Sequence, residues 1–243
     1  MTQNASVIDS LKIIIHSHPI FRPVLALNEW RWWLRGALKG SFAQHGEDRF
    51  LLEYFGTRVG RYIDVGANHP FKLSNTYLLY RKGWHGINIE PIPALHAKIA
   101  RKRPRDLNLN IGVGRERGSM TFYEMHPNVL STFNRQVQET LVRTGQGHLC
   151  NTYEVPIRSV SDIYREYMAG VDLDLLLIDT EGFEMDVLNG IEWDLFRPKL
   201  IVIETTTLSG LGGKTDIARL LEQQHYEPIR RLGCNTIFEL RTP

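Results

Sequence analysis

Acidic and amide side chains stand where short apolar runs of the chain end: Asp64, Glu90, Asn110, Asp179 and Glu204. Each run has the composition of a buried strand, and the carboxyl ends of parallel strands open into a single crevice. Acids that serve only solubility would not fall at strand ends so regularly. The pattern therefore predicts one ligand-binding crevice lined by hydrogen-bonding groups.

The turn after the first of these strands, Asp64-Val65-Gly66-Ala67-Asn68, indicates what kind of ligand the crevice takes. A diphosphate needs several glycines so that the backbone can approach it closely, and this turn has one. The retained acid suits a ligand with an amine and hydroxyls, such as S-adenosylmethionine. Taken alone, however, a strand that ends in Asp-x-Gly is equally typical of an ordinary turn.

Two later strand ends strengthen the cofactor interpretation. Glu90 lies 26 residues beyond Asp64, close to the ~20-residue spacing at which a second-strand carboxylate binds the hydroxyls of a ribose. Asn110 falls near the end of the third strand, where the edge of an adenine needs an amide partner. The ends of neighbouring strands flank one nucleoside. Asp64 and Glu90 together therefore indicate a cofactor site more strongly than either residue does alone.

A polar pair, Gln44-His45, precedes a helix that begins near Glu47 and Asp48. The dipole of a helix stabilises acidic side chains in its first turn, so this stretch is compatible with a simple helix start. An equally compatible interpretation is that the side chains of Gln44 and His45 extend into the cofactor pocket. We interpret the basic run Arg101-Lys102-Arg103-Pro104-Arg105 as a solvated helix end rather than a phosphate-binding patch.

The elements that position these groups alternate between strands and helices, as in an open α/β sheet. The patterns predict strands at 62–65, 86–90, 107–114, 120–124, 173–179, 199–204, 229–231 and 236–240, and helices at 74–82, 93–102, 161–168, 183–188 and 214–225. Residues 126–150 show no clear periodicity, which favours a functional or mobile loop.

Composition excludes several classes of protein. The 243 residues carry a net charge of +2, so bulk electrostatics give no reason to expect nucleic acid as a partner. Cys150 and Cys234 are too far apart in sequence for a zinc motif or a disulfide framework, and a reduced cytoplasmic location is expected. We find no signal-peptide pattern and no apolar run near the ~20 residues that span a bilayer.

Residues 1–40 differ from the rest and predict an N-terminal helical extension. Trp30, Trp32 and Trp33 are interleaved with Arg31, Arg35 and Lys39. One interpretation is an arm that packs over the core. The others are a lid or wall for the substrate, or a helix that rests on a membrane surface as a peripheral contact.

Several motifs together resemble the FkbM family of S-adenosylmethionine-dependent O-methyltransferases, over about residues 41–241. They are Ser41-x-x-Gln44-x-Gly46-Glu47-Asp48, Tyr62-Ile63-Asp64-Val65-Gly66-Ala67-Asn68, Asn88-Ile89-Glu90-Pro91, Asn110-Ile111-Gly112-Val113-Gly114, Leu177-Ile178-Asp179-Thr180-Glu181-Gly182-Phe183-Glu184 and Asn235-Thr236-Ile237-Phe238. Thr180, where the family often has valine, and His69-Pro70 after the turn are departures from the pattern.

The resemblance implies a Rossmann-like class I methyltransferase domain at residues 41–243. Its α/β fold would have a seven-stranded, mostly parallel sheet with helices on both faces. S-adenosyl-L-methionine would lie along the turn that contains Gly66. The implied cofactor-binding residues are Asp64 and Asn68 for the methionine end, Glu90 for the ribose and Asn110 for the adenine rim, with Gln44 beside them.

The acceptor implied by the resemblance is a hydroxyl, because family members methylate sugars and polyketide natural products. The chain also resembles rhizobial enzymes that 2-O-methylate fucose on lipochitin nodulation signals. We therefore expect a glycan, a glycolipid or a small natural product as acceptor.

A hydroxyl must lose its proton to become a good nucleophile, so a base or a metal ion is expected. Asp179 is the preferred base, and Glu181 either lines the acceptor pocket or supplies charge to a helix N-terminus. Alternatively, Asp179 and Glu204 hold a divalent cation such as Mg²⁺. The sequence leaves three histidines as rival bases: His69, His126 and His148.

Two further functions stay open from the sequence. One is an NAD-dependent or nucleotide-sugar enzyme on a similar sheet, which the absence of a multi-glycine turn argues against. The other is a non-catalytic nucleoside-binding protein on the same fold, which the full set of strand-end acids argues against.

Overall fold

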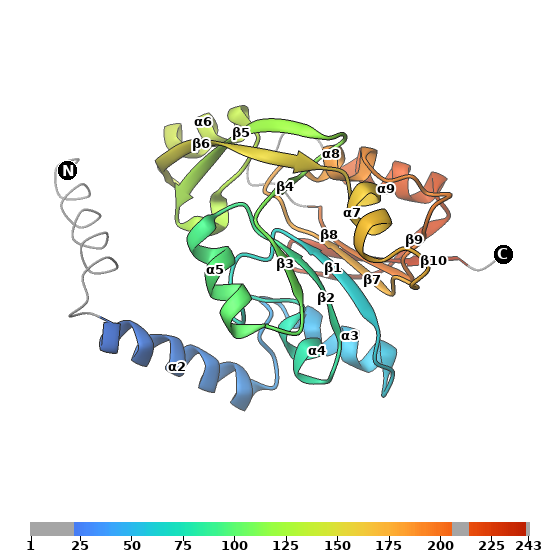
Figure 1. Ribbon diagram of the computed structural model, residues 1–243, viewed down its shortest axis with the longest axis horizontal. Coiled ribbons are helices and arrows are strands. Elements are labelled where there is room, and N and C mark those ends of the chain that lie inside the picture. Colours follow the sequence, from blue (N-terminus) through green and yellow to red (C-terminus); the bar gives the residue numbers. More distant parts are fainter. Residues whose placement is uncertain (1–21, 206–213, 242–243) are drawn as a thin grey trace.

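A seven-stranded sheet forms the centre of the computed structural model, which describes residues 22–205 and 214–241 (Figure 1). The strand order is β3-β2-β1-β7-β8-β10-β9. Their bounds are β1 (Arg61–Val65), β2 (His85–Ile89), β3 (Leu107–Leu109), β7 (Leu175–Ile178), β8 (Leu200–Glu204), β9 (Tyr226–Leu232) and β10 (Asn235–Leu240). β10 is antiparallel to both of its neighbours, and the pairs from β3 to β8 are parallel.

Alternation along the buried strands divides the core into two apolar layers, one on each face of the sheet. In β7, Leu176 and Ile178 join one layer while Leu175 and Leu177 join the other. This follows from the two-residue period of a strand, and it gives a strand that is apolar throughout. The mostly parallel seven-stranded sheet with helices on both faces is thereby confirmed.

The helices cover these two layers unequally. α3 (Glu47–Phe55) and α4 (Tyr77–Arg81) pack on one face, where Trp84 is also buried. Residues of four further helices enter the opposite layer: α5 (Pro93–Lys102), α7 (Val160–Tyr167), α8 (Glu184–Asn189) and α9 (Lys214–Gln223). The helix predicted over 74–82 begins only at Tyr77, whose backbone N–H donates to Ser74 Oγ at 3.2 Å.

The single strand predicted over 107–114 is wrong, because the chain changes sheets there. β3 ends at Leu109, and β4 (Gly112–Val113) pairs instead with β6 (His148–Arg158). The side chain of Asn110 makes the break: its Nδ2 donates to the carbonyls of Glu90 at 2.8 Å and Pro91 at 2.9 Å. β5 (Gly118–His126) completes this second sheet, in the order β4-β6-β5.

The expectation of a long irregular loop over 126–150 is also wrong. The stretch contains the end of β5, a short 3₁₀ helix η2 (Asn128–Leu130), helix α6 (Arg135–Arg143) and the start of β6. Met125, Leu130, Val137 and Leu141 form a small apolar cluster of their own beneath it. The helical spacing of Val137 and Leu141, which both face this cluster, is therefore a signal of structure that sequence reasoning overlooked.

Helix α2 (Arg22–Lys39) precedes this domain and contacts it through one face. Trp33 Nε1 donates to the hydroxyl of Tyr77 at 3.1 Å, and Trp33 and Ala37 pack against a cluster that includes Phe42. Residues 1–21 of the predicted extension lie outside the described residues, and its boundary at residue 40 stays a prediction. No helix in the described ranges has both the length and the apolarity needed to cross a bilayer.

The basic run at the end of α5 is solvated except for Arg103, where our interpretation is wrong. Arg103 is fully buried, whereas Arg101 is exposed. Its guanidinium donates to Asp106 Oδ2 at 2.7 Å, to Thr76 Oγ1 at 2.9 Å and to the hydroxyl of Tyr62. It thereby ties α5 to the strands beneath the crevice.

We predict that Arg103→Met lowers the free energy of unfolding by about 3–5 kcal/mol, because it leaves the buried carboxylate of Asp106 without its cation. The exposed neighbour provides the control, since Arg101→Met should change that free energy by less than about 0.5 kcal/mol. Urea denaturation of the two variants measures both values. Equal losses in the free energy of unfolding of the two variants would show that the buried ion pair adds no stability beyond that of an exposed arginine.

Candidate functional site

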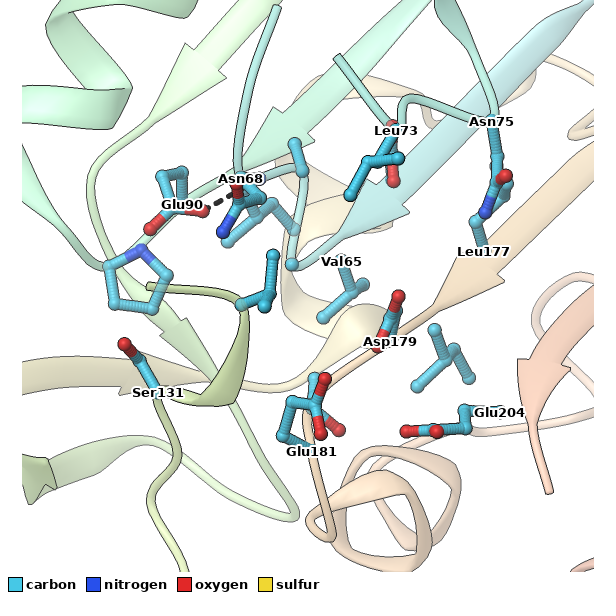
Figure 2. Close-up of a pocket in the computed structure, with 18 of the residues that line it drawn as sticks. Val65, Asn68, Leu73, Asn75, Glu90, Ser131, Leu177, Asp179, Glu181 and Glu204 are labelled. Atoms are coloured by element: carbon cyan, nitrogen blue, oxygen red, sulfur yellow. Dashed lines mark hydrogen bonds between the residues drawn. The ribbon is translucent and has the colours of Figure 1, made fainter. Parts of the chain in front are cut away.

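A cavity of about 420 Å³ opens at the carboxyl ends of β1, β2, β7 and β8. This volume lies within the range of roughly 300–1,000 Å³ that is usual for small-molecule sites. Its lining includes eight of the nine residues predicted for the site: Gln44, Asp64, Gly66, Asn68, Glu90, Asp179, Glu181 and Glu204. Figure 2 shows Glu90 on one side of this cavity and the other three labelled acids across from it.

Asn110 is the ninth predicted residue, and it does not line the cavity. Its side chain is exposed beside it. Both hydrogens of its amide are used to hold the carbonyls of Glu90 and Pro91. Asn110 therefore positions the end of β2, and its contact with an adenine stays a prediction.

The turn at Gly66 is shaped by close packing between two strand ends. Gly66 has φ 85°, and a Cβ there would lie 1.9 Å from the backbone oxygen of Asp179. No other residue type fits such an approach. Asn68 also has a positive φ, 51°, which asparagine tolerates better than most residues. The turn thus holds the end of β1 directly against the end of β7.

Glu90 fastens this turn from the other side. Its carboxylate accepts the backbone N–H of Asn68 and that of Ile92, each at 2.8 Å. Figure 2 draws the first of these bonds. Burial raises the pKa of Glu90 to about 7, against the lowering effect of the two hydrogen bonds. Each carboxylate oxygen keeps acceptor capacity, which a pair of ribose hydroxyls can use.

Asp64 is buried and faces the cavity from within β1. Its Oδ2 accepts the hydroxyl of Thr76 at 2.5 Å, and Thr76 in turn accepts from Arg103. Burial raises the pKa of Asp64, while the guanidinium of Arg103 and the bond from Thr76 oppose that rise. The carboxyl is therefore held in one orientation, as a partner for a ligand amine must be.

Both interpretations of the stretch before α3 describe part of the structure. Asp48 accepts the backbone N–H groups of Phe42 at 2.6 Å and Ala43 at 3.2 Å, and Glu47 accepts that of His45 at 2.8 Å. These buried acids fold the preceding loop back over the helix start. That loop places the pair Gln44-His45 on the cavity wall.

Three carboxylates meet at the ends of β7 and β8. Asp179, Glu181 and Glu204 each present an oxygen, and these oxygens lie within 4.8 Å of one another. The pKa of Asp179 is raised to about 7, that of Glu204 to about 9 and that of Glu181 to about 10. Burial is the largest cause in each case, and the neighbouring carboxylates add to it.

Glu204 provides the clearest evidence that this cluster has an unsatisfied hydrogen-bond acceptor. Only 6% of the residue is exposed, and its Oε2 is buried with no hydrogen-bond partner among the described residues. A buried carboxylate oxygen without a partner is costly in a folded protein. The oxygen is therefore open to a proton, a cation or a ligand donor.

The loop that carries Glu181 adopts a backbone conformation that other residues enforce. Glu181 and Gly182 have positive φ, 53° and 94°. Glu184 accepts the backbone N–H groups of Thr180 at 3.0 Å and Gly182 at 3.1 Å, so Glu184 rather than Glu181 holds the start of α8. Such local strain persists at functional sites when the surroundings impose it.

Sequence reasoning missed two of the residues that impose this loop. Thr132 Oγ1 donates to the carbonyl of Glu181 at 2.9 Å, and Asn134 Nδ2 donates to that of Gly182 at 3.1 Å. Both lie in the stretch that we expected to be an irregular loop. Asn235 was also missed as a wall residue, although its motif was visible: it lines the cavity and donates to Glu47 Oε1 at 2.8 Å.

The three histidines named as rival bases do not line the cavity. His69 lies beside α2, with Nε2 4.0 Å from Glu29, and burial lowers its pKa to about 4. His126 and His148 face each other across the β5–β6 pair, with ring centroids 5.1 Å apart.

Between its polar ends the cavity has an apolar wall that includes Ile92, Val113, Phe122 and Phe133. An aromatic base packs well on such a wall, while hydroxyls and an amine find Glu90 and Asp64 at its edges. The arrangement suits a nucleoside with an amino-acid arm, and the unpaired acids beyond that arm suit a positive charge or a proton. The donor set therefore fits S-adenosylmethionine.

A family model described as the methyltransferase FkbM domain matches residues 64–228, more than half of the chain. The chain belongs to the FkbM family. The matched segment is a methyltransferase domain, and its sheet has the Rossmann-like class I architecture. This membership favours methyl transfer over the NAD-dependent or nucleotide-sugar enzyme that the sequence left open.

One curated relative of this FkbM protein is methyltransferase sdnD of Sordaria araneosa, 34% identical over 87 residues. The match covers 32% of this chain and spans about a third of the relative, 32% of its length. The similarity is therefore confined to about a third of each protein and leaves the acceptor open.

Solved structures are similar to this chain at a distance. A TehB-like S-adenosylmethionine-dependent methyltransferase from Corynebacterium glutamicum is 13% identical with a TM-score of 0.45, over 90% of this chain and 100% of that one. The fibrillarin pre-rRNA processing protein of Methanococcus jannaschii is 10% identical with a TM-score of 0.41, over 75% and 67%. Likenesses this distant say nothing about the acceptor.

The carboxylate cluster predicts how stability changes with pH in the ligand-free FkbM protein. The folded-state pKa of Glu204, about 9, lies above its ordinary value of 4.5, so the folded state binds this proton more tightly than the unfolded state. The resulting stability is present below about pH 4.5 and is lost as pH rises through 9. We expect Glu204→Gln, which stays neutral, to raise the melting temperature at pH 9 by at least about 2–4 °C.

Thermal denaturation in the presence of a chelator measures this effect at pH 5 and pH 9. The exposed Glu116→Gln serves as the control and should melt like the wild type at both values. A Glu204→Gln variant with the same pH dependence as the wild type would contradict the prediction.

Proposed function

We propose that this FkbM methyltransferase is an O-methyltransferase that acts on a hydroxyl of a sugar, carried by a glycan or a glycolipid. The observation that carries the proposal is the cluster of Asp179, Glu181 and Glu204 at one side of the cavity, in which Oε2 of Glu204 has no hydrogen-bond partner among the described residues. A hydroxyl acceptor must lose a proton, and Asp179, whose pKa is raised to about 7, is the acid of this cluster that is partly ionised near neutral pH and able to accept it.

The cofactor-binding half of the proposal assigns roles to residues on the cavity wall. Asp64 would hold the amine, Glu90 the ribose hydroxyls, and the turn with Asn68 would lie along the methionine arm. S-adenosylmethionine supplies a methyl group on a positively charged sulfur with a good leaving group. Because that chemistry resides in the cofactor, the protein's task is to align the acceptor oxygen.

Asp179 is the preferred general base. It follows β7 directly and faces the cavity, where the surrounding protein shields its carboxylate from bulk water, beside the Gly66 turn that its own backbone contacts. Its carboxylate would accept the proton of the acceptor hydroxyl. Glu181, in its enforced conformation, would face the same oxygen from the loop before α8 and orient it.

A second arrangement is favoured by the orphaned Oε2 of Glu204. Oxygen ligands from Asp179, Glu181 and Glu204 suit a hard divalent cation such as Mg²⁺. Such a cation acidifies a hydroxyl that it binds. The residues present fit this role, which the sequence assigns to Asp179 and Glu204, and Glu181 adds a third oxygen.

The mouth of the cavity bears on the acceptor. Leu73 and Val129 line it, with 37% and 39% of their surfaces exposed. Apolar side chains at a polar cavity's mouth suit an acceptor that joins a hydroxyl-bearing head to an apolar part, as a glycolipid does. A lipochitin oligosaccharide, with the 2-hydroxyl of its fucose as the methylated group, fits this description. A polyketide, which is the alternative acceptor, fits it as well.

The proposed location is the cytoplasm. Cys150 and Cys234 are not joined in a disulfide, as expected of a protein in a reducing compartment.

We predict that Asp64→Asn weakens binding of S-adenosylhomocysteine at least about tenfold, because the ligand amine loses a charged partner. Binding of 5′-methylthioadenosine, which has no amine on its arm, should be unchanged and shows that the cavity has survived. Isothermal titration calorimetry measures both ligands, with the exposed Asp172→Asn as a control. Undiminished binding of S-adenosylhomocysteine would count against the assignment of Asp64.

We predict that methyl-labelled S-adenosylmethionine transfers its label to a glycolipid acceptor, and that Asp179→Asn lowers kcat by about 10²–10⁴ while cofactor binding persists. Free oligosaccharides and polyketides complete the acceptor panel. Activity that a chelator abolishes and Mg²⁺ restores selects the cation, whereas activity indifferent to chelator selects Asp179 as base. No transfer to any acceptor, with cofactor bound, would support the non-catalytic alternative instead.

A further inference from the structure

Helix α2 (Arg22–Lys39) exposes an apolar stripe that the core does not use. The exposed fractions of Leu27, Trp30 and Leu38 are 55%, 55% and 79%. These positions, with the partly exposed Leu34 between them, recur at intervals of three and four residues. At 3.6 residues per turn they lie on one face of the helix.

A neighbouring face of α2 fixes its orientation on the domain. Trp33 donates to Tyr77 and packs beside Phe42, and Glu29 forms an ion pair with Lys98 at 3.1 Å. Figure 1 shows α2 at the margin of the molecule, outside the layers that cover the sheet. The apolar stripe is therefore not the core-facing side of the helix, and none of its residues lines the cavity.

The solvent-exposed charged side chains of this helix are all positive. Arg31, Arg35 and Lys39 are exposed. On a helical wheel Arg31 and Arg35 border the apolar stripe along one edge. Glu29 is the single acid of α2, and it is turned inward to Lys98. The outward half of the helix thus combines a leucine–tryptophan stripe with a basic border and no acid.

We propose that this face of α2 binds the surface of an anionic phospholipid membrane. Leucine and tryptophan side chains enter the boundary between headgroups and acyl chains, and flanking arginines pair with anionic headgroups. Tryptophan is favoured at that depth because its ring is amphipathic. The inference does not depend on which acceptor the site methylates.

The charge pattern argues against a second copy of the chain as the occupant. A two-fold contact through the stripe would bring the same face of two molecules together, and with it Arg31 and Arg35 of both. Like charges at the border of a contact oppose it. An anionic surface satisfies the apolar stripe and the basic border at once.

Vesicle co-sedimentation of the full chain tests the proposal, with phosphatidylcholine vesicles and with vesicles of phosphatidylcholine and phosphatidylglycerol. We expect binding to the anionic vesicles that weakens with added salt. Trp30→Ser/Leu38→Ser and Arg31→Glu/Arg35→Glu should each reduce partitioning at least about tenfold. Val59→Ser/Val142→Ser, at residues 54% and 43% exposed elsewhere on the surface, should bind like the wild type.

Unchanged melting temperature and S-adenosylhomocysteine affinity show that each variant is folded, so a loss of binding can be assigned to the surface. Equal binding to both kinds of vesicle, or binding that survives both α2 variants, would overturn the proposal. Light scattering tests the remaining alternative, which is dimerisation through the apolar stripe. A wild-type dimer that Trp30→Ser/Leu38→Ser converts to a monomer would reassign the stripe to self-association and overturn it as well.

Discussion

Acidic groups that have no counter-charge among the described residues, confined where two neighbouring strands end, are the constraint on which this structure depends. Asp179, Glu181 and Glu204 share a cavity whose other electrostatic neighbours are also acids. In a medium less polarisable than water such a cluster resists ionisation, and its raised pKa values express that resistance. Folding tolerates the cluster because the two layers of the core on either side of the sheet are largely apolar.

Charge of this kind is useful only if its geometry is held rigidly, and the backbone supplies that rigidity. The Gly66 turn contacts the backbone of Asp179 so closely that the two strand ends behave as one piece. Glu90 and Glu184 each fasten a turn by accepting backbone N–H groups. The acids of this FkbM methyltransferase thus divide into those that hold the loops and those that the loops present to a ligand.

Beneath the cavity, a second polar network plays the opposite role. Arg103, Asp106, Tyr62 and Thr76 satisfy one another in the interior and end at Asp64. A fully connected buried network rigidifies its surroundings, whereas a partly satisfied one is a weak point. The chain therefore places paired charges below the cavity and a cluster of like-charged groups within it, so that a ligand can complete the second and leave the first undisturbed.

Local patterns in the amino-acid sequence account for the sheet, the location of its carboxyl edge and most of the residues on the cavity wall. A run such as Leu175–Ile178 is apolar on both faces, and the acid that follows it must emerge at the edge. The family motifs are local as well. Residues such as Asp64, Glu90 and Asp179 can therefore be assigned to one crevice from the order of residue types along the chain.

Packing between distant segments decides which of several similar residues takes each role. Arg103 and Arg101 are alike in sequence, and packing alone buries the first. Thr132 and Asn134 reach the Glu181 loop across 49 and 48 positions of sequence. The Oε2 of Glu204 is left without a partner among the described residues by the arrangement of the elements around it. Burial and pairing are properties of the whole packed chain, so no local pattern can encode them.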